Sequence, residues 1–305
     1  MKRYFIWGIA LIMLVSLLAC SKKDQTQPYV GIDTPIKNDK SVYKQEITKD
    51  DTQNKVTQKK EEPKKQEVLG ASTYVGLSND IKGWGLKRNS LHQTPEIPKA
   101  ITDLVKKYNG IYLGDTSKKT IYLTFDEGYE NGYTAKILDA LKVNNVHAAF
   151  FITGPYVKEH ADLVKRMIDE GHIIGNHTIN HPSLPSLSTE KLEQEIISLD
   201  NMVYEKWKIN MRFMRPPKGE YSERVLTQLK DLGHRAVFWS FAYDDYDVNN
   251  QRGTDYAYKI MMNNLHNGAV YLVHAVSKDN ANALDNVIKD AKSQGYEFGT
   301  LDQIQ

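Results

Sequence analysis

Residues 121–128 read IYLTFDEG, a short apolar run that ends in two adjacent acids and a glycine. Such a run, closed by a glycine turn, indicates a buried β-strand. The acids Asp126 and Glu127 therefore stand where the strand meets its turn. A pair of acids in a turn is most often only solvated, so a functional role needs support from the rest of the chain.

Similar apolar runs recur downstream, and helix-like sequence follows each of them. We expect further strands at residues 148–153, 172–175, 211–214, 236–240 and 269–273, with a last one near Phe298. The clearest helix is expected over Thr189–Trp207, with an apolar stripe and Ser188 as its cap, and another over residues 281–293. Strands that alternate with helices indicate βα units. The predicted fold class is α/β, a (β/α) barrel of TIM type that is distorted or incomplete.

Active sites of such barrels lie at the carboxyl ends of the strands, and polar residues follow several strands here. His177 and His181 follow the third strand, and their H-x-x-x-H spacing would place both imidazoles on one side of a helical turn, facing one divalent cation. Arg215 follows the fourth strand and begins an RPPKG loop, in which Pro217 and Gly219 fix the backbone. An arginine there can hold a carboxylate ionised and oriented.

The next two strands lead to Asp245 with Tyr246, and to His274. A lone histidine at a strand end is more often packed or capping than catalytic. All of these residues nevertheless fall at successive strand ends of one predicted barrel. Together they supply a carboxylate base, a metal-binding pair, an orienting arginine and a second titratable acid, which favours a functional site over a chance arrangement.

Three longer stretches carry a family resemblance: FDEGYENGYT (125–134), GHIIGNH (171–177) and LVHAVSKDNANAL (272–284). In this order they resemble the polysaccharide deacetylase, or NodB-homology, family, whose members remove acetyl groups from N-acetylated sugars with a divalent metal. Within the family they look most like the δ-lactam-forming muramic acid deacetylases of spore-forming bacteria. The resemblance covers about residues 80–304.

The resemblance implies roles for four residues of acid–base chemistry. Asp126 would be the general base that takes a proton from water, and Arg215 would hold it in place. His274 would be the general acid for the leaving amine, and Asp245 would tune it. These roles agree with general acid–base catalysis by groups whose pKa values are separated.

The resemblance also implies a metal bound by His177 and His181. Glu127 stands where many members have an aspartate as third ligand, and it is one methylene longer. It is expected either to reach the metal or to leave a two-histidine site completed by water. Zinc suits nitrogen-rich sites, and manganese or cobalt stays open.

Sugar contacts are expected from Tyr246, Pro217 and Gly219, although a core position is an equal alternative for the tyrosine. The remaining histidines match no motif and are expected to have structural roles or to lie on the surface: His92, His147, His160, His172, His234 and His266.

The N-terminus has the layout of a secretory signal, with Lys2 and Arg3 before an apolar segment that stops at Cys20. Residues 17–20, LLAC, resemble a bacterial lipobox, so we expect a signal peptide over residues 1–20 and a lipid on Cys20. An uncleaved membrane anchor is the alternative. Residues 21–71 are polar and poor in aromatics, which predicts a disordered linker before a catalytic domain at residues 72–305.

The charge balance and the cysteine count exclude other classes of protein. Lysine and arginine number 40 against 38 acids, a net charge of +2, which argues against a nucleic-acid-binding protein. The single cysteine excludes an intramolecular disulfide framework and a multi-cysteine zinc site.

The leading hypothesis is an extracytoplasmic, lipid-anchored hydrolase of carbon–nitrogen bonds that deacetylates peptidoglycan N-acetylmuramic acid. By the resemblance, an amidase first strips the stem peptide, and the freed amine then closes a muramic δ-lactam of the spore cortex type. One alternative is a deacetylase of N-acetylglucosamine in peptidoglycan or chitin-like glycans. Another is a glycan-binding protein without catalysis.

Overall fold

The computed structural model describes residues 71–305. The predicted signal peptide, Cys20 and the predicted linker up to residue 70 lie outside the described residues. The helices are α1 (Lys99–Lys107), α2 (Thr134–Val143), α3 (Gly154–Glu159), α4 (Ala161–Asp169), α5 (Thr189–Trp207), α6 (Glu223–Asp231), α7 (Thr254–Asn263) and α8 (Lys278–Ser293). The strands are β1 (Lys82–Gly83), β2 (Thr120–Glu127), β3 (Ala149–Ile152), β4 (Ile173–Asn176), β5 (Phe213–Met214), β6 (Glu220–Tyr221), β7 (Arg235–Ala236), β8 (Ala269–His274) and β9 (Glu297–Gly299).

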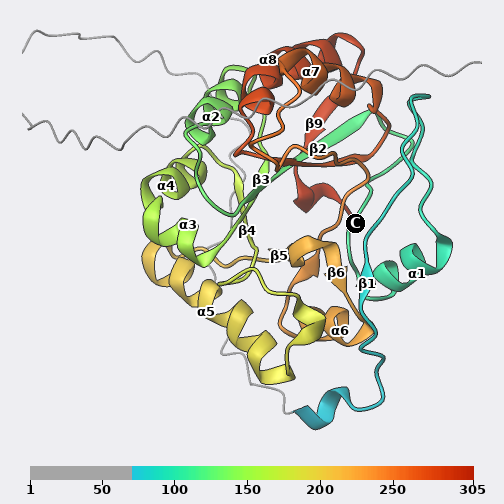
Figure 1. Ribbon diagram of the computed structural model, residues 1–305, viewed down its shortest axis with the longest axis vertical. Coiled ribbons are helices and arrows are strands. Elements are labelled where there is room, and N and C mark those ends of the chain that lie inside the picture. The colour runs from blue at the N-terminus through green and yellow to red at the C-terminus, as the bar shows by residue number, and fades with distance from the viewer. Residues whose placement is uncertain (1–70) are drawn as a thin grey trace, which may run out of the picture. The chain divides into compact units, whose positions relative to one another are not determined.

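Seven of these strands form one curled parallel sheet (Figure 1). Their order is β7-β5-β4-β3-β2-β8, and β9 pairs with β2. The ladder is thin between β4 and β5, where Asn176 and Met214 are the one registered pair. Single bridges from Val237 to Ile111 and from Phe241 to Tyr271 link the sheet's two edges. The expected α/β fold is confirmed as a distorted, incomplete barrel.

β2 lies between β8 on one edge and β3 with β9 on the other, and it is buried along almost its whole length. Its residues 120–122 pair with β9 and residues 124–127 with β3, while residues 121–126 pair with β8 on the opposite edge. The β2–β8 register sets Asp126 directly opposite His274. Parallel pairing thus carries two expected site residues to one edge of the sheet.

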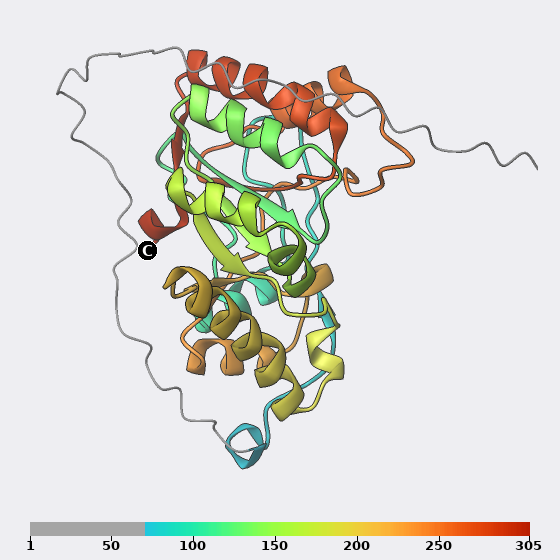
Figure 2. The same cartoon turned by 90° about the vertical axis from the view of Figure 1, so that its left-hand side faces the viewer.

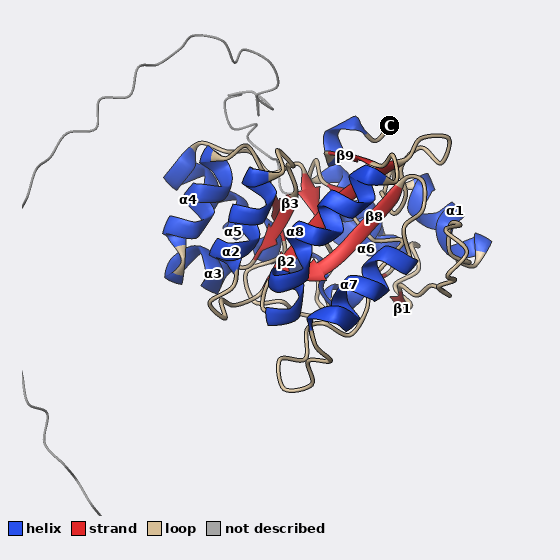
Figure 3. Ribbon diagram, turned by 90° about the horizontal axis from the view of Figure 1, so that it is seen from above, coloured by secondary structure: helices blue, strands red, loops and turns tan. Residues whose placement is uncertain are grey.

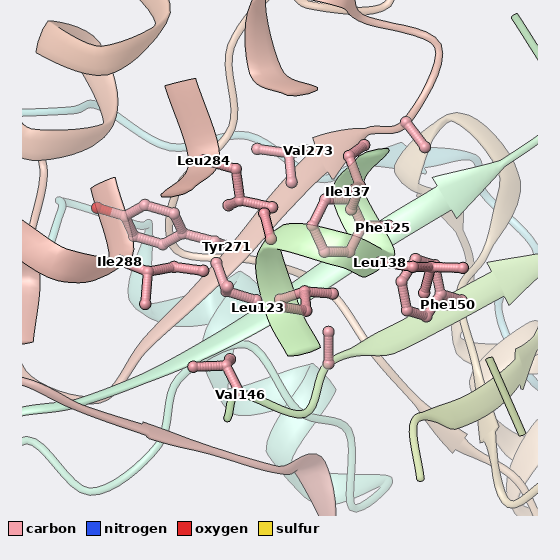
Figure 4. Packing of buried hydrophobic residues seen from close by; sticks show 14 of the residues in the cluster. Leu123, Phe125, Ile137, Leu138, Val146, Phe150, Tyr271, Val273, Leu284 and Ile288 are labelled. Carbon is pink, nitrogen blue, oxygen red and sulfur yellow. The ribbon is translucent and has the colours of Figure 1, made fainter. Parts of the chain in front are cut away.

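The main apolar core lies between this sheet and its helices. Figure 4 shows Leu123 and Phe125 of β2 packed with Ile137 of α2 and with Leu284 and Ile288 of α8. Each of these side chains is 2 % exposed or less. Full burial of such side chains contributes about 1.5–3 kcal/mol each, so this contact fixes β2 against its helices.

Helices surround the strands (Figure 3), and α8, α2, α4 and α5 follow one another along one side of the sheet (Figure 2). The expected bounds of α5 are confirmed, and the Ser188 side chain caps it by accepting a hydrogen bond from Lys191 N–H at 3.3 Å. α8 begins earlier than expected, at Lys278, because Ser277 caps it in the same way. Within residues 71–305 no helix has the length and apolar composition that crossing a bilayer requires.

Two parts of the fold differ from the sequence-based expectation. The strand expected at residues 236–240 pairs with β5 only as far as Ala236, and the residues that follow form single bridges, from Val237 to Ile111 and from Phe241 to Tyr271 of β8. The antiparallel ribbon of β1 and β6, which pairs Lys82 with Tyr221, was not expected. This ribbon ties the start of the described chain to the loop after Arg215.

Candidate active site

A cleft of about 820 Å³ opens at the carboxyl ends of the strands. Most of the expected site residues line it, and they come from β2, β8 and the segments after β4, β5 and β7: Asp126, His177, His181, Gly219, Tyr246 and His274. Arg215 and Asp245 lie behind these residues and are buried. The structure therefore gathers residues that are up to 148 positions apart, from Asp126 to His274, at one place.

Asp126 and Arg215 form a buried ion pair. Arg215 Nη1 donates to Asp126 Oδ1 at 2.7 Å, and Nη2 donates to Thr124 Oγ1 at 2.7 Å. The guanidinium lies 4.3 Å from the ring centroid of Phe151. Burial alone would raise the pKa of Asp126, but the positive charge of Arg215, with smaller effects of His177 and His274, holds this pKa below its ordinary value. The carboxylate is thus kept ionised and fixed in orientation.

His274, on the strand next to that of Asp126, forms a second pair with Asp245. Asp245 Oδ1 lies 2.8 Å from His274 Nδ1, and Asp245 Oδ2 accepts the His274 backbone N–H at 2.8 Å. Asn280 also donates its amide to Asp245 Oδ2, at 2.5 Å. Burial alone would lower the pKa of His274, but the Asp245 carboxylate raises it above its ordinary value. The imidazolium form, which can donate a proton, is thereby stabilised.

His177 and His181 face each other with ring centroids 4.7 Å apart. The expected helical turn between them is wrong, because residues 177–181 form a loop in which Thr178 (φ 69°) and His181 (φ 57°) are left-handed. Asn176 Oδ1 accepts the Thr178 N–H at 2.7 Å, and Thr178 Oγ1 accepts the His181 N–H at 2.9 Å. Such side-chain hydrogen bonds compete with helix formation.

The chemistry of these donors fits a divalent metal. His177 Nδ1 lies 2.8 Å from the Arg215 carbonyl oxygen, to which it donates, so the Nε2 lone pair is left for a ligand. Burial lowers the pKa of His177 to about 4, and burial also lowers the pKa of His181. Both rings are therefore neutral, as metal binding requires. His177 Nε2 lies 3.5 Å from Asp126 Oδ2, so a carboxylate stands beside the pair.

Within residues 71–305 no group of three or more histidine, cysteine or acidic side chains has the spacing of a complete metal site. Structural zinc sites are closed by four protein ligands, whereas catalytic sites keep positions for water or substrate. The histidine pair fits only the second kind, with positions left for non-protein ligands.

Glu127 is not brought to the two histidines. Its side chain is fully buried, does not line the cleft, and accepts a hydrogen bond from Thr134 Oγ1 at 3.4 Å. Neighbouring side chains of a strand point to opposite faces, and β2 extends through Glu127 here, so Glu127 lies on the face opposite to that of Asp126. Burial, with Glu130 nearby, raises the pKa of Glu127 well above its ordinary value. The geometry does not support the expected third ligand.

The expected sugar contacts are partly in place. Tyr246 lies at the cleft mouth, 61 % exposed, with its ring centroid 5.8 Å from that of His274. Gly219 lines the cleft, whereas Pro217 is buried outside the lining, where Pro216 takes its place. The first proline of the loop, rather than the second, therefore faces the substrate side.

Sequence reasoning missed several residues of this site. Thr124 holds the second arm of Arg215, and its position two residues before Asp126 on the same strand face could have indicated it. Trp239 and Tyr129 line the cleft, as does Lys218 of the RPPKG loop. No pattern in the sequence marks Trp239 or Tyr129, because their loops are irregular.

The polysaccharide deacetylase family model matches residues 113–237. Peptidoglycan-N-acetylmuramic acid deacetylase PdaA of Bacillus subtilis is 48% identical over 236 residues, which cover 77% of this chain and 90% of that protein. A peptidoglycan-N-acetylglucosamine deacetylase of Bacillus cereus is 34% identical over 191 residues, covering 62% of this chain and 89% of the relative.

Solved structures show the same likeness. The structure of Bacillus subtilis PdaA, described as a family 4 carbohydrate esterase, has a TM-score of 0.73 and covers 75% of this chain and 98% of that one. A family 4 carbohydrate esterase from Bacillus anthracis is 42% identical with a TM-score of 0.64, again covering 75% of this chain and 98% of the other.

Proposed function

Since the chain belongs to the polysaccharide deacetylase family, and is therefore a carbon–nitrogen hydrolase, we propose that it deacetylates N-acetylmuramic acid in peptidoglycan. The sugar assignment is supported by the 48% identity to the muramic acid deacetylase PdaA, against 34% to a glucosamine deacetylase. The observation that carries the reaction is the placement, on neighbouring strands of one cleft, of Asp126 with a lowered pKa and His274 with a raised pKa.

In the proposed reaction Asp126 takes a proton from the attacking water, and Arg215 keeps the carboxylate ionised and aimed into the cleft. Water oxygen bonds to the acetyl carbon, and the bond from this carbon to nitrogen breaks. His274 gives its proton to the leaving nitrogen, so that acetate and a free amine result. Asp245 holds the imidazole in the tautomer and orientation that this transfer needs.

Enzymes of this family are generally metal-dependent. We propose that His177 and His181 hold a divalent ion, for which zinc suits the nitrogen donors and manganese or cobalt is the alternative. A bound ion of this kind polarises an amide carbonyl and acidifies water. The chain's own part is to present two neutral imidazoles beside Asp126, which the carbonyl of Arg215 and the loop hydrogen bonds achieve.

The product amine then forms an amide with the lactyl carboxyl group of the same sugar, which releases water and closes the muramic δ-lactam. This closure requires a free lactyl carboxyl, so an amidase that removes the stem peptide would act first. A role in the modified wall of spores follows from this product. The chain would act outside the cytoplasm, held at the membrane by a lipid on Cys20, and the mass of the mature N-terminus would distinguish this anchor from an uncleaved one.

In the test, the full-length protein is incubated with added divalent metal and with peptidoglycan. One peptidoglycan sample has been treated with an amidase and the other has not. Mass spectrometry of the muropeptides should show acetyl loss and δ-lactam only after amidase treatment. The variant Asp126→Asn should lower kcat by about 10²–10⁴-fold while remaining folded, because it removes the base. Acetyl loss from N-acetylglucosamine would show that the protein is a glucosamine deacetylase instead. Binding of peptidoglycan without release of acetate would support a glycan-binding protein without catalysis.

A further inference from the structure

Lys218 has an unusual place in the cleft. Among the described residues that line the cleft it is the only lysine or arginine, since Arg215 is buried behind the wall. Its side chain is exposed, and no hydrogen bond or ion pair to a described residue engages its ammonium group. The cleft thus carries an unneutralised positive charge on its own lining.

The backbone of Lys218 is held in a left-handed conformation, with φ 60° and ψ 5°. Residues other than glycine seldom adopt it, because their Cβ crowds the neighbouring carbonyl at a cost of roughly 1–2 kcal/mol. The turn is fixed on both sides: Gly219 N–H donates to the Pro216 carbonyl at 3.1 Å, and a Cβ on Gly219 would lie 2.7 Å from Trp239. The fold therefore keeps a lysine where a glycine would be less strained.

The charge of Lys218 lies near the reacting groups. Lys218 lines the same cleft as Asp126, His181 and His274. Asp126, the acid that lines the same cleft, is already paired with the buried Arg215, whose Nη1 donates to Asp126 Oδ1 at 2.7 Å. An anionic group of the substrate is what remains to pair with this ammonium group.

We propose that Lys218 binds the lactyl carboxylate of the substrate sugar and so selects muramic acid residues whose carboxyl group is free. This inference rests on the proposed function. N-acetylglucosamine has no lactyl group, and a muramic acid that still carries its stem peptide has an uncharged amide there. Lys218 would thus discriminate against both of these sugars. It would also explain why an amidase has to free the lactyl carboxyl group before deacetylation.

The experiment compares two short glycan fragments that differ only at the lactyl group, one with a free carboxylate and one with its methyl amide. The full-length protein with added metal should favour the carboxylate in kcat/KM. Lys218→Met, which keeps most of the side-chain stem and removes the charge, should shrink this preference up to about fivefold, mainly through KM, because an ion pair in a partly open cleft contributes on this order. Lys218→Arg should restore most of it.

Lys208→Met is the matched control. Lys208 is also exposed and left-handed, with φ 60°, but it ends α5 and does not line the cleft. This variant should keep the wild-type preference. A preference that survives in Lys218→Met, or a wild-type protein that processes both fragments equally, would overturn the inference and leave the proposed function standing. A wild-type protein that deacetylates neither fragment would overturn both.

Discussion

Two neighbouring acids of β2 have opposite surroundings. Asp126 faces the cleft and two cationic groups, whereas Glu127 faces the buried side next to Thr134 and Tyr156. The first keeps a low pKa and the second a high one, and both shifts follow from the alternation of side chains along a strand. The adjacent acids of the sequence therefore occupy two different environments, one in the cleft and one in the buried interior.

The variant Glu127→Gln tests this division. Glutamine copies the shape of the protonated acid, so activity and metal content should stay at wild-type values and the free energy of unfolding should change by less than about 1 kcal/mol. Metal analysis, kinetics and urea unfolding would measure the three quantities. Loss of bound metal in this variant would restore Glu127 as a ligand.

At the scale of elements, the loop of residues 177–181, here called the histidine loop, depends on α5. The amide nitrogen of Asn176 donates to the Ile196 carbonyl and to Asp200 Oδ1, both at 2.9 Å, which leaves its oxygen facing Thr178. His234 Nε2 lies 2.8 Å from the other oxygen of Asp200. Helix α5 thereby orients the amide that shapes the loop.

The variant Asp200→Ala should release this amide while leaving both histidines in the chain. We expect divalent metal affinity to fall about tenfold, the usual size of an indirect effect on metal ligands, with a smaller change in stability. Titration calorimetry with the metal alone would measure it. Glu205→Ala, an exposed acid on the same helix, is the control, and equal affinities in the two variants would show that Asp200 does not act on the loop.

Elements with strong local signals could be predicted, and the others could not. The bounds of α5 follow from the Ser188 cap and from an apolar stripe that matches the helical period. The histidine loop was misjudged because spacing alone does not reveal that Asn176 and Thr178 bind the backbone instead. β1 and β6 have two residues each, too few for any pattern to appear.

At the scale of the whole molecule, the rule that barrel active sites lie at the carboxyl ends of strands located the site. It did not predict how the two edges of the sheet are joined. Buried parallel strands read as apolar runs, so the residues that follow them could be collected from the sequence. The bridges of Ile111 and Phe241 lie in irregular segments, where pairing depends on tertiary contacts alone. Which way Glu127 faced depended on where β2 ended, the least predictable feature of a strand.

His172 makes the stability of the whole domain sensitive to acid. Its ring is buried and accepts the Ala148 N–H on Nδ1 at 3.2 Å. Burial, with a smaller effect of His147, lowers its pKa from 6.5 to about 4. The unfolded chain therefore binds the proton more tightly, and the stabilisation is complete above pH 6.5 and lost as pH falls toward 4.

Because of this histidine, we expect the free energy of unfolding to fall by roughly 3 kcal/mol as the pH is lowered from 6.5 to 4. Urea unfolding of the wild type and of His172→Asn, whose side-chain oxygen can take the place of Nδ1, would measure the difference in pH slope. Parallel slopes for the two proteins would show that another group controls the acid response.

The pairing of β2 with the end of the chain also has a consequence for biosynthesis. The strand that carries Asp126 obtains its neighbours β8 and β9 from residues 269–274 and 297–299, the last strands to be synthesised. A nascent or truncated polypeptide that ends before residue 269 has neither His274 nor a partner for one edge of β2. The edge of the sheet that carries Asp126 is therefore completed late, after translation of the domain is nearly finished.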